Sequence, residues 1–122
     1  MIKVLIVDDS FLQRKIIRNF FKQHPDVDVI EAVHGQDGLD KLSQEKVDIM
    51  VLDLLMPVMS GEETLKELKN RESKIPVIIC SADIQDITKK NCLELGALRF
   101  INKPPKENEL SEAFEAAIRC IQ

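Results

Sequence analysis

Three aspartates in this sequence stand directly after apolar runs that have the composition of strands. Asp8 and Asp9 follow the run Ile2–Val7, and Asp53 follows the run Val47–Leu52. Three carboxylates packed together repel one another unless a cation joins them. Oxygen ligands without histidine or cysteine suit Mg²⁺, which prefers an octahedral site with retained waters. These aspartates therefore predict a magnesium site if the fold brings them together.

A hydroxyl group and an amine come at the ends of two later apolar runs. Ser81 follows Val77–Cys80, and Lys103 comes shortly after Leu98–Ile101. Beside a magnesium ion a carboxylate can act as a nucleophile toward phosphorus, because the ion neutralises the charge that gathers on the transferred oxygens. Lys103 would add a second cation and Ser81 a hydrogen-bond donor. The set indicates an anion site around one acceptor carboxylate.

Each of these residues alone has an ordinary structural explanation. Asp9 could cap the next helix, and Asp53 could form a turn. Ser81 could cap a helix that begins near Ile84, and Lys103 could be a solvated loop charge. The functional interpretation depends on all of them meeting at one edge of the fold.

Five apolar runs predict five strands, and helix-period segments lie between them. The runs have the Val, Ile and Leu density of strands buried on both faces: Ile2–Val7, Val27–Ala32, Val47–Leu52, Val77–Cys80 and Leu98–Ile101. Helices are expected over Leu12–Phe21, Gly35–Glu45, Gly61–Arg71, Ile84–Leu95 and Leu110–Ile121. Strict alternation implies a parallel sheet with helices on both faces, whose strands end at a common edge.

Length and charge exclude several classes of protein. A chain of 122 residues has the usual size of one domain, and we expect residues 1–122 to form a single domain with no output domain. The net charge is −4 and the basic residues are scattered, so nucleic-acid binding is not expected. No apolar run approaches the ~20 residues that span a bilayer, and no signal peptide is apparent. We therefore expect a cytoplasmic protein without membrane contact.

The cysteine count gives a further expectation. Cys80, Cys92 and Cys120 show no spacing typical of metal ligands. We expect all three to be buried or partly buried free thiols.

From end to end, the chain resembles the receiver domain of two-component response regulators. The resemblance rests on the ordered segments LIVDDS, DIMVLDLLMPVMSG, VIICSA and RFINKPP, with the intervals between them that this family shows. It implies an α/β fold of the flavodoxin-like type, a (βα)5 three-layer sandwich with a parallel five-stranded sheet in the order 2-1-3-4-5.

The resemblance also implies roles for the acidic residues and their neighbours. Asp53 matches the phosphoacceptor, and Asp8 and Asp9 match the acidic pair that holds Mg²⁺. Leu55 matches the position whose backbone carbonyl binds the metal, although members often carry a polar side chain there. Gly61 fits the loop beyond the acceptor.

Residues on the last two strands complete the implied site. Ser81 matches the hydroxyl residue that contacts the phosphoryl group, and Lys103 matches the lysine that precedes a proline in this family. Phe100 matches the switch aromatic but lacks the hydroxyl group of the commoner tyrosine. The same resemblance predicts a cis peptide bond between Lys103 and Pro104.

A receiver domain would take its phosphoryl group from a histidine kinase and change the binding of a downstream protein. The stand-alone length and the segment KPPKENEL favour chemotaxis, with the flagellar switch as a possible target and a phosphatase as a further partner. Such a protein catalyses only its own phosphorylation and dephosphorylation.

Two alternatives remain open: a phosphorelay intermediate, and a Mg²⁺-dependent phosphohydrolase with an aspartyl-phosphate intermediate. The hydrolase would need an acid two residues beyond the nucleophile, where this chain has Leu55. A nucleotidyl module of topoisomerase-primase type would want an acidic pair on a later strand, and Leu54 and Leu55 do not supply one. A nucleotide-binding protein would want a Gly-rich loop after the first strand, and none is present.

Overall fold

The computed structural model describes all 122 residues, and strands alternate with helices along the chain. The strands are β1 (Ile2–Val7), β2 (Val27–Ala32), β3 (Ile49–Leu52), β4 (Val77–Ser81) and β5 (Arg99–Asn102). The helices are α1 (Phe11–Phe21), α2 (Gly35–Gln44), α3 (Gly61–Asn70), α4 (Asp86–Glu94) and α5 (Glu107–Ile121). The predicted alternation is confirmed.

All strands run parallel in one sheet, in the order β2-β1-β3-β4-β5. Val7 of β1 lies opposite Leu52 of β3, so the next residue of each strand, Asp8 and Asp53, leaves the sheet at the same level. Ser81 lies opposite Asn102, which places Lys103 one residue beyond the sheet at the same edge. The flavodoxin-like fold and its strand order are confirmed.

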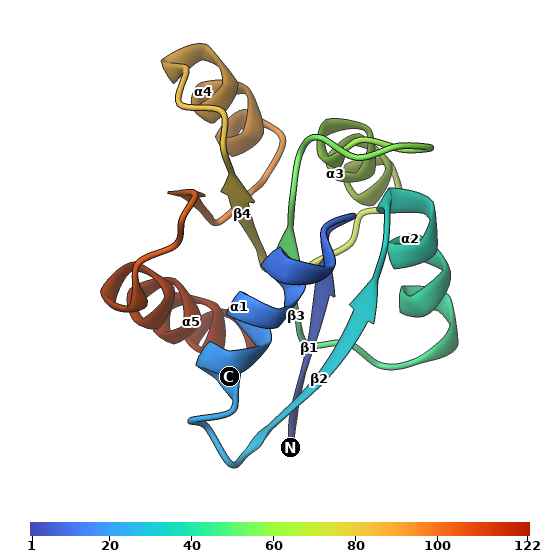
Figure 1. Ribbon diagram of the computed structural model, residues 1–122. Coiled ribbons are helices and arrows are strands. Elements are labelled where there is room, and N and C mark those ends of the chain that lie inside the picture. Colours follow the sequence, from blue (N-terminus) through green and yellow to red (C-terminus); the bar gives the residue numbers. More distant parts are fainter.

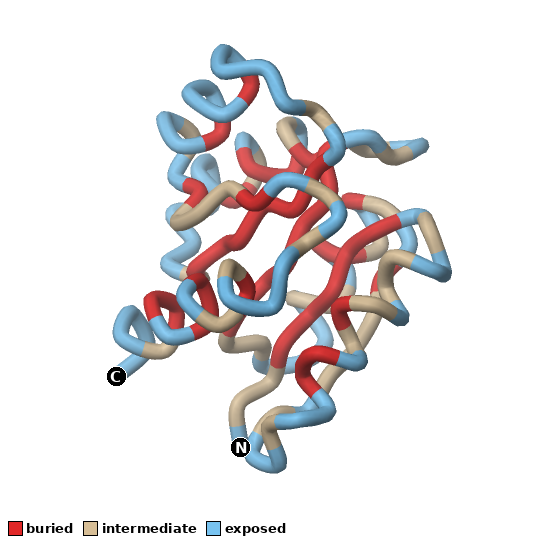
Figure 2. Tube along the Cα trace, turned by 60° about the vertical axis from the view of Figure 1, so that its left-hand side comes forward, coloured by how far each residue is buried: buried red, intermediate tan, exposed pale blue.

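Two hydrophobic cores hold the helices against the sheet. Side chains alternate between the two faces of a strand. In β3, Ile49 and Val51 therefore join the core under α1 and α5, whereas Met50 and Leu52 join the core under α2, α3 and α4. Figure 1 shows α1 and α5 together on one side of the sheet, with α2 and α3 on the other. Figure 2 shows the buried central strands, with helices whose outer surfaces are exposed.

Several element boundaries differ from the expected ones, and side-chain hydrogen bonds accompany the changed starts of β3 and α4. β3 begins at Ile49 rather than Val47, and the Asp48 side chain accepts a hydrogen bond from the Lys3 N–H at 2.8 Å. α4 begins at Asp86 rather than Ile84, because side chains bend the chain before it. The Ser81 hydroxyl accepts from the Asp83 N–H at 3.1 Å, so Ser81 forms a turn and is not the cap of α4.

The cysteines agree only in part with the expectation. Cys80 and Cys92 are buried, and burial raises the pKa of Cys80 to about 12 and that of Cys92 to about 11. Neither thiol is therefore reactive at neutral pH. The expectation for Cys120 is wrong, because this residue is exposed near the end of α5.

No helix combines the length and the apolar character that crossing a bilayer would require.

Candidate functional site

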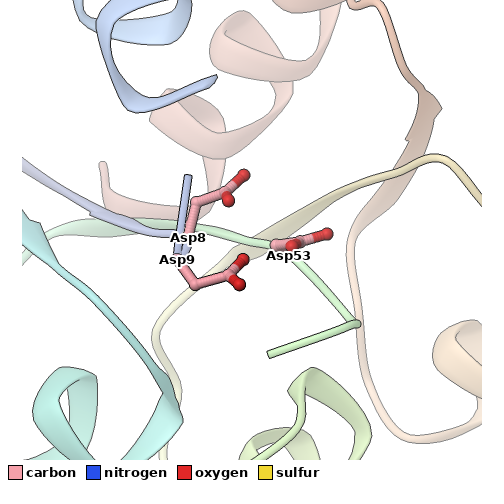
Figure 3. A group of neighbouring side chains, drawn as sticks. All are labelled: Asp8, Asp9 and Asp53. Atoms are coloured by element: carbon pink, nitrogen blue, oxygen red, sulfur yellow. The ribbon is translucent and has the colours of Figure 1, made fainter. Parts of the chain in front are cut away.

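The three aspartates that follow β1 and β3 meet at the carboxyl edge of the sheet. One carboxylate oxygen from each of Asp8, Asp9 and Asp53 lies within 4.8 Å of the other two. Figure 3 shows these side chains gathered at the ends of the two strands. Asp8 and Asp53 are only 2% and 6% exposed, whereas Asp9 is open to solvent. The acidic cluster thus has two buried members and one member that faces water.

Lys103 is the cation of this site. Its Nζ donates to Asp8 Oδ2 at 2.9 Å and lies 3.3 Å from Asp53 Oδ1. Burial alone would lower the pKa of Lys103, but the hydrogen bond and charge of Asp8, together with Asp53, hold this pKa above its usual value. The ammonium group therefore stays charged at neutral pH. The Lys103–Pro104 peptide bond is cis, as predicted.

The carboxyl group of Asp53 lies in a setting that disfavours its charge. Burial and the nearby negative charge of Asp8 raise the pKa of Asp53, and the attraction of Lys103 only partly offsets them. Any further positive charge near Asp53 would stabilise its ionised form and lower its pKa.

The donor set fits a magnesium ion. Three carboxylates face one ammonium group, and Asp9 has no ion-pair partner. The available ligands are hard oxygens with no histidine or cysteine among them, which is the set that Mg²⁺ prefers. Leu55, whose backbone carbonyl is the further predicted ligand, lies two residues beyond Asp53 with its side chain 73% exposed.

The loop after β3 brings α3 close to Asp53. Gly61, the first residue of α3, donates its N–H to the Leu54 carbonyl at 2.9 Å. A Cβ atom at Gly61 would lie 2.2 Å from the Asp53 carbonyl oxygen, so only glycine allows this approach. Ser60 and Glu63 form a capping box at the start of α3. The end of β3 and the start of α3 are thereby fixed relative to each other.

Val58 in the same loop is a feature that the sequence did not reveal. Its φ is 68°, an outlier for a β-branched residue, and its side chain is 77% exposed. The Met59 N–H donates to the Pro57 carbonyl at 2.7 Å across it. Such a conformation costs about 1–3 kcal/mol. The loop between Asp53 and α3 therefore holds backbone strain.

Ser81 lies at the same edge of the sheet as the acidic cluster, and neither Ser81 nor Phe100 is bonded to that cluster. Ser81 is fully buried, and its carbonyl accepts from the Lys103 N–H at 2.8 Å. Its hydroxyl is occupied by the turn to Asp83. Phe100 is half-buried and packs on the α4 side of the sheet, where it lines a cavity of about 160 Å³ with Ile84 and Lys89.

A second set of charges that the sequence analysis missed lies on α1 and β2. Arg14 donates to the Asp8 carbonyl at 2.7 Å and to Glu31 Oε1 at 2.9 Å. Arg18, one turn later, donates to Glu31 Oε2 at 2.9 Å. Burial opposes the charge of Glu31, but Arg18 and Arg14 hold its pKa below the usual value. The spacing of the two arginines was visible in the sequence, but their partner on β2 was not.

Comparison with known proteins identifies the family. The family model described as response regulator receiver domain matches residues 4–115. The chain belongs to the response regulator receiver family. A solved structure of the chemotaxis protein CheY4 from Vibrio cholerae superposes with a TM-score of 0.85 at 26% identity, over 96% of this chain and 98% of that one.

Two curated relatives differ in length. The chemotaxis protein CheY of Listeria monocytogenes is 36% identical, over 98% of this receiver chain and 100% of the relative. The protein-glutamate methylesterase/protein-glutamine glutaminase of Clostridium acetobutylicum is 44% identical over 99% of this chain, which spans 36% of that protein's length. The receiver chain thus matches one relative throughout and about a third of the other.

The raised pKa of Asp53 leads to a prediction for the metal-free protein. The folded state holds this proton more tightly than the unfolded state, so rising pH lowers stability from about pH 4, the usual pKa of an aspartate, up to the raised pKa. Asp53→Asn removes the titrating group. In EDTA at pH 7 we expect a higher midpoint of thermal unfolding, by about 4 °C for ~1 kcal/mol in a domain of this size.

The gain in stability from Asp53→Asn should disappear below about pH 3, where both states of the wild type are protonated. Asp26→Asn removes one exposed charge before β2 and serves as the control. A lower midpoint for Asp53→Asn at pH 7, with Asp26→Asn unchanged, would show that Lys103 outweighs burial.

Proposed function

We propose that this protein is a phosphoacceptor response regulator that receives a phosphoryl group on Asp53 from a histidine kinase and thereby switches the binding of a partner protein. One observation carries the proposal. In a member of the receiver family, Asp53 is a buried carboxylate held between Lys103 and a further acidic pair. That setting provides a nucleophile together with positive charge for the transferred oxygens.

In the proposed phosphoryl transfer, Asp53 is the only group of this protein that forms a covalent bond to phosphorus. An Asp53 carboxylate oxygen forms a bond to phosphorus while the bond from phosphorus to the donor imidazole nitrogen breaks. The imidazole leaves with the electron pair of that bond and takes up a proton. Lys103, already 3.3 Å from Asp53, stabilises the negative charge on the phosphoryl oxygens.

Magnesium is the proposed cofactor. Asp8, Asp9, Asp53 and the backbone carbonyl of Leu55 would hold it, and Asp9 has an unpaired carboxylate available for this. When bound, the ion would supply positive charge that the single ammonium group of Lys103 cannot provide alone. The buried carboxylate of Asp53 would then be ionised and ready to react.

We further propose that residues 1–122 form one receiver domain that acts in chemotaxis on a separate target, such as the flagellar switch. The match to a chemotaxis protein over that relative's whole length supports this assignment. Such a protein works in the cytoplasm, turns over no outside substrate and is reset by its own hydrolysis or by a phosphatase. The second candidate, favoured by the higher identity to the methylesterase relative, is the receiver region of a protein of that kind.

The signal would leave the site through Ser81 and Phe100. A phosphoryl group adds roughly 1.5 to 2 negative charges and attracts hydroxyl donors. Ser81 ends β4, and Phe100 lies opposite Ile79 of the same strand, beside a cavity that gives its ring room to move. If Ser81 exchanges its turn bond for the phosphoryl group, Phe100 can move inward and the surface of α4 and β5 changes.

The acceptor assignment can be tested by mass spectrometry of the intact protein after incubation with acetyl phosphate. Wild type should gain the mass of one phosphoryl group in Mg²⁺ and none in EDTA, because the protein has one acceptor carboxylate and the phosphorylation of that carboxylate requires Mg²⁺. Asp53→Asn should gain nothing. The control Asp26→Asn should behave like wild type. A full gain of mass in Asp53→Asn would refute the assignment.

The output path can be tested by ¹⁵N NMR with and without beryllofluoride, a stable mimic of the phosphoryl group. In wild type, we expect amide shifts to change both around Asp53 and along α4. Phe100→Ala should keep the first set and lose most of the second, because the ring that links them is gone. Leu12→Ala, which removes an exposed apolar side chain on α1, should keep both sets. Equal α4 changes in Phe100→Ala and wild type would return Phe100 to a packing role.

A further inference from the structure

Arg14 makes the one side-chain hydrogen bond to the peptide group between Asp8 and Asp9. Its Nη1 donates to the Asp8 carbonyl at 2.7 Å, and its side chain is 12% exposed. A peptide group is planar, so a bond that fixes the carbonyl oxygen also fixes the nitrogen and the start of the next residue. Arg14 thereby constrains the backbone from which the Asp9 carboxylate extends.

The two members of the acidic pair are held in different ways. The Asp8 carboxylate is fixed directly, by the Ser10 N–H at 2.9 Å on one oxygen and by Lys103 on the other. The Asp9 carboxylate is exposed and has no hydrogen-bond or ion-pair partner in the protein. Its direction is therefore set by its backbone, and the Arg14 contact is the side-chain restraint on that backbone.

Glu31 holds Arg14 in this place. It sits on β2, opposite Ile6 of β1, and receives Arg14 on one carboxylate oxygen and Arg18 on the other. The clamp fixes the guanidinium group of Arg14 and leaves its Nη1 aimed at Asp8. Arg18 shares the clamp but makes no contact with Asp8. Both arginines thus bind Glu31, but only Arg14 also contacts Asp8.

We propose that Arg14, clamped by Glu31, is a positioning residue for magnesium, which holds the Asp8–Asp9 peptide group so that the Asp9 carboxylate faces the acidic cluster. The inference rests on the proposed function, since it concerns how the site would take its cation. Groups that orient metal ligands typically change metal affinity by 10–100-fold when they are removed.

The experiment compares Mg²⁺ affinity by calorimetric titration with thermal stability for wild type, Arg14→Gln and Arg18→Gln. Each variant replaces an arginine of α1 and loses its ion pair with Glu31 of β2, so both should lose stability, and Arg14→Gln should lose more because Arg14 is more buried and also donates to the Asp8 carbonyl. Only Arg14→Gln loses the Asp8 contact, and we expect it to bind Mg²⁺ about 10-fold more weakly, the lower end of the range for such groups. Arg18→Gln should stay within about 2-fold of wild type, because its ion pair is partly exposed.

Two further variants keep the test decisive if Arg14→Gln does not fold. Arg14→Lys retains one cationic donor for the Asp8 carbonyl and should recover most of the affinity. Glu31→Gln leaves Arg14 without its charged anchor and should weaken Mg²⁺ binding more than Arg18→Gln does. Wild-type affinity in Arg14→Gln, or in Glu31→Gln where Arg14→Gln is unfolded, would overturn the inference, as would an equal loss in Arg18→Gln. Absence of Mg²⁺ binding by the wild type would instead refute the proposed function.

Discussion

The ion pairs of Lys103 with Asp8 and Asp53 join the ends of three strands and set the charge balance on which the site depends. The contact between Lys103 and Asp8 spans 95 positions of sequence, so it exists only when the whole sheet has formed. It leaves the cluster short of positive charge, with three carboxylates facing one ammonium group. The fold therefore presents a site that a divalent cation would complete. Repulsion among these carboxylates lowers the stability of the metal-free fold, as is usual where functional sites gather like charges.

The rest of the molecule holds the three carboxylates and the ammonium group in place. Two cores on opposite faces fix the sheet, and the register of β1 with β3 sets the level at which Asp8 and Asp53 emerge. Gly61 lets α3 begin against the backbone of Asp53, while Val58 carries strained backbone in the same loop. Parts that would have to move are less constrained. The Ser81 hydroxyl takes part in one hydrogen bond, which it accepts from the Asp83 N–H, and Phe100 is half-buried beside a cavity.

Much of this could be predicted from sequence, because a parallel sheet leaves a strong local signature. Continuous apolar runs located the strands, and the polar residue after each run located the edge where Asp8, Asp53 and Lys103 meet. The strand order came from resemblance, since hydrophobic periodicity carries no information on which strands are neighbours. The start of α4 was placed two residues too early, because the Asp83 side chain accepts from the Gln85 N–H and holds residues 83–85 in a turn.

Contacts between side chains of different helices and strands could not be predicted from the sequence. The link from Glu31 through Arg14 to Asp8 needs the pairing of β2 with β1 and the rotation of α1 above them. The positive φ of Val58 has no local signal, because valine is among the residues least expected there. Cys120 was taken for a buried or partly buried thiol, yet it falls on the exposed side of α5.

The most direct test of this account is a crystal structure of the protein grown with Mg²⁺ and beryllofluoride. The account requires the beryllofluoride on a carboxylate oxygen of Asp53, with Mg²⁺ bound by Asp8, Asp9 and the Leu55 carbonyl and with Lys103 in contact with the fluoride atoms. An adduct on another residue, or a metal ion bound away from the three aspartates, would contradict it.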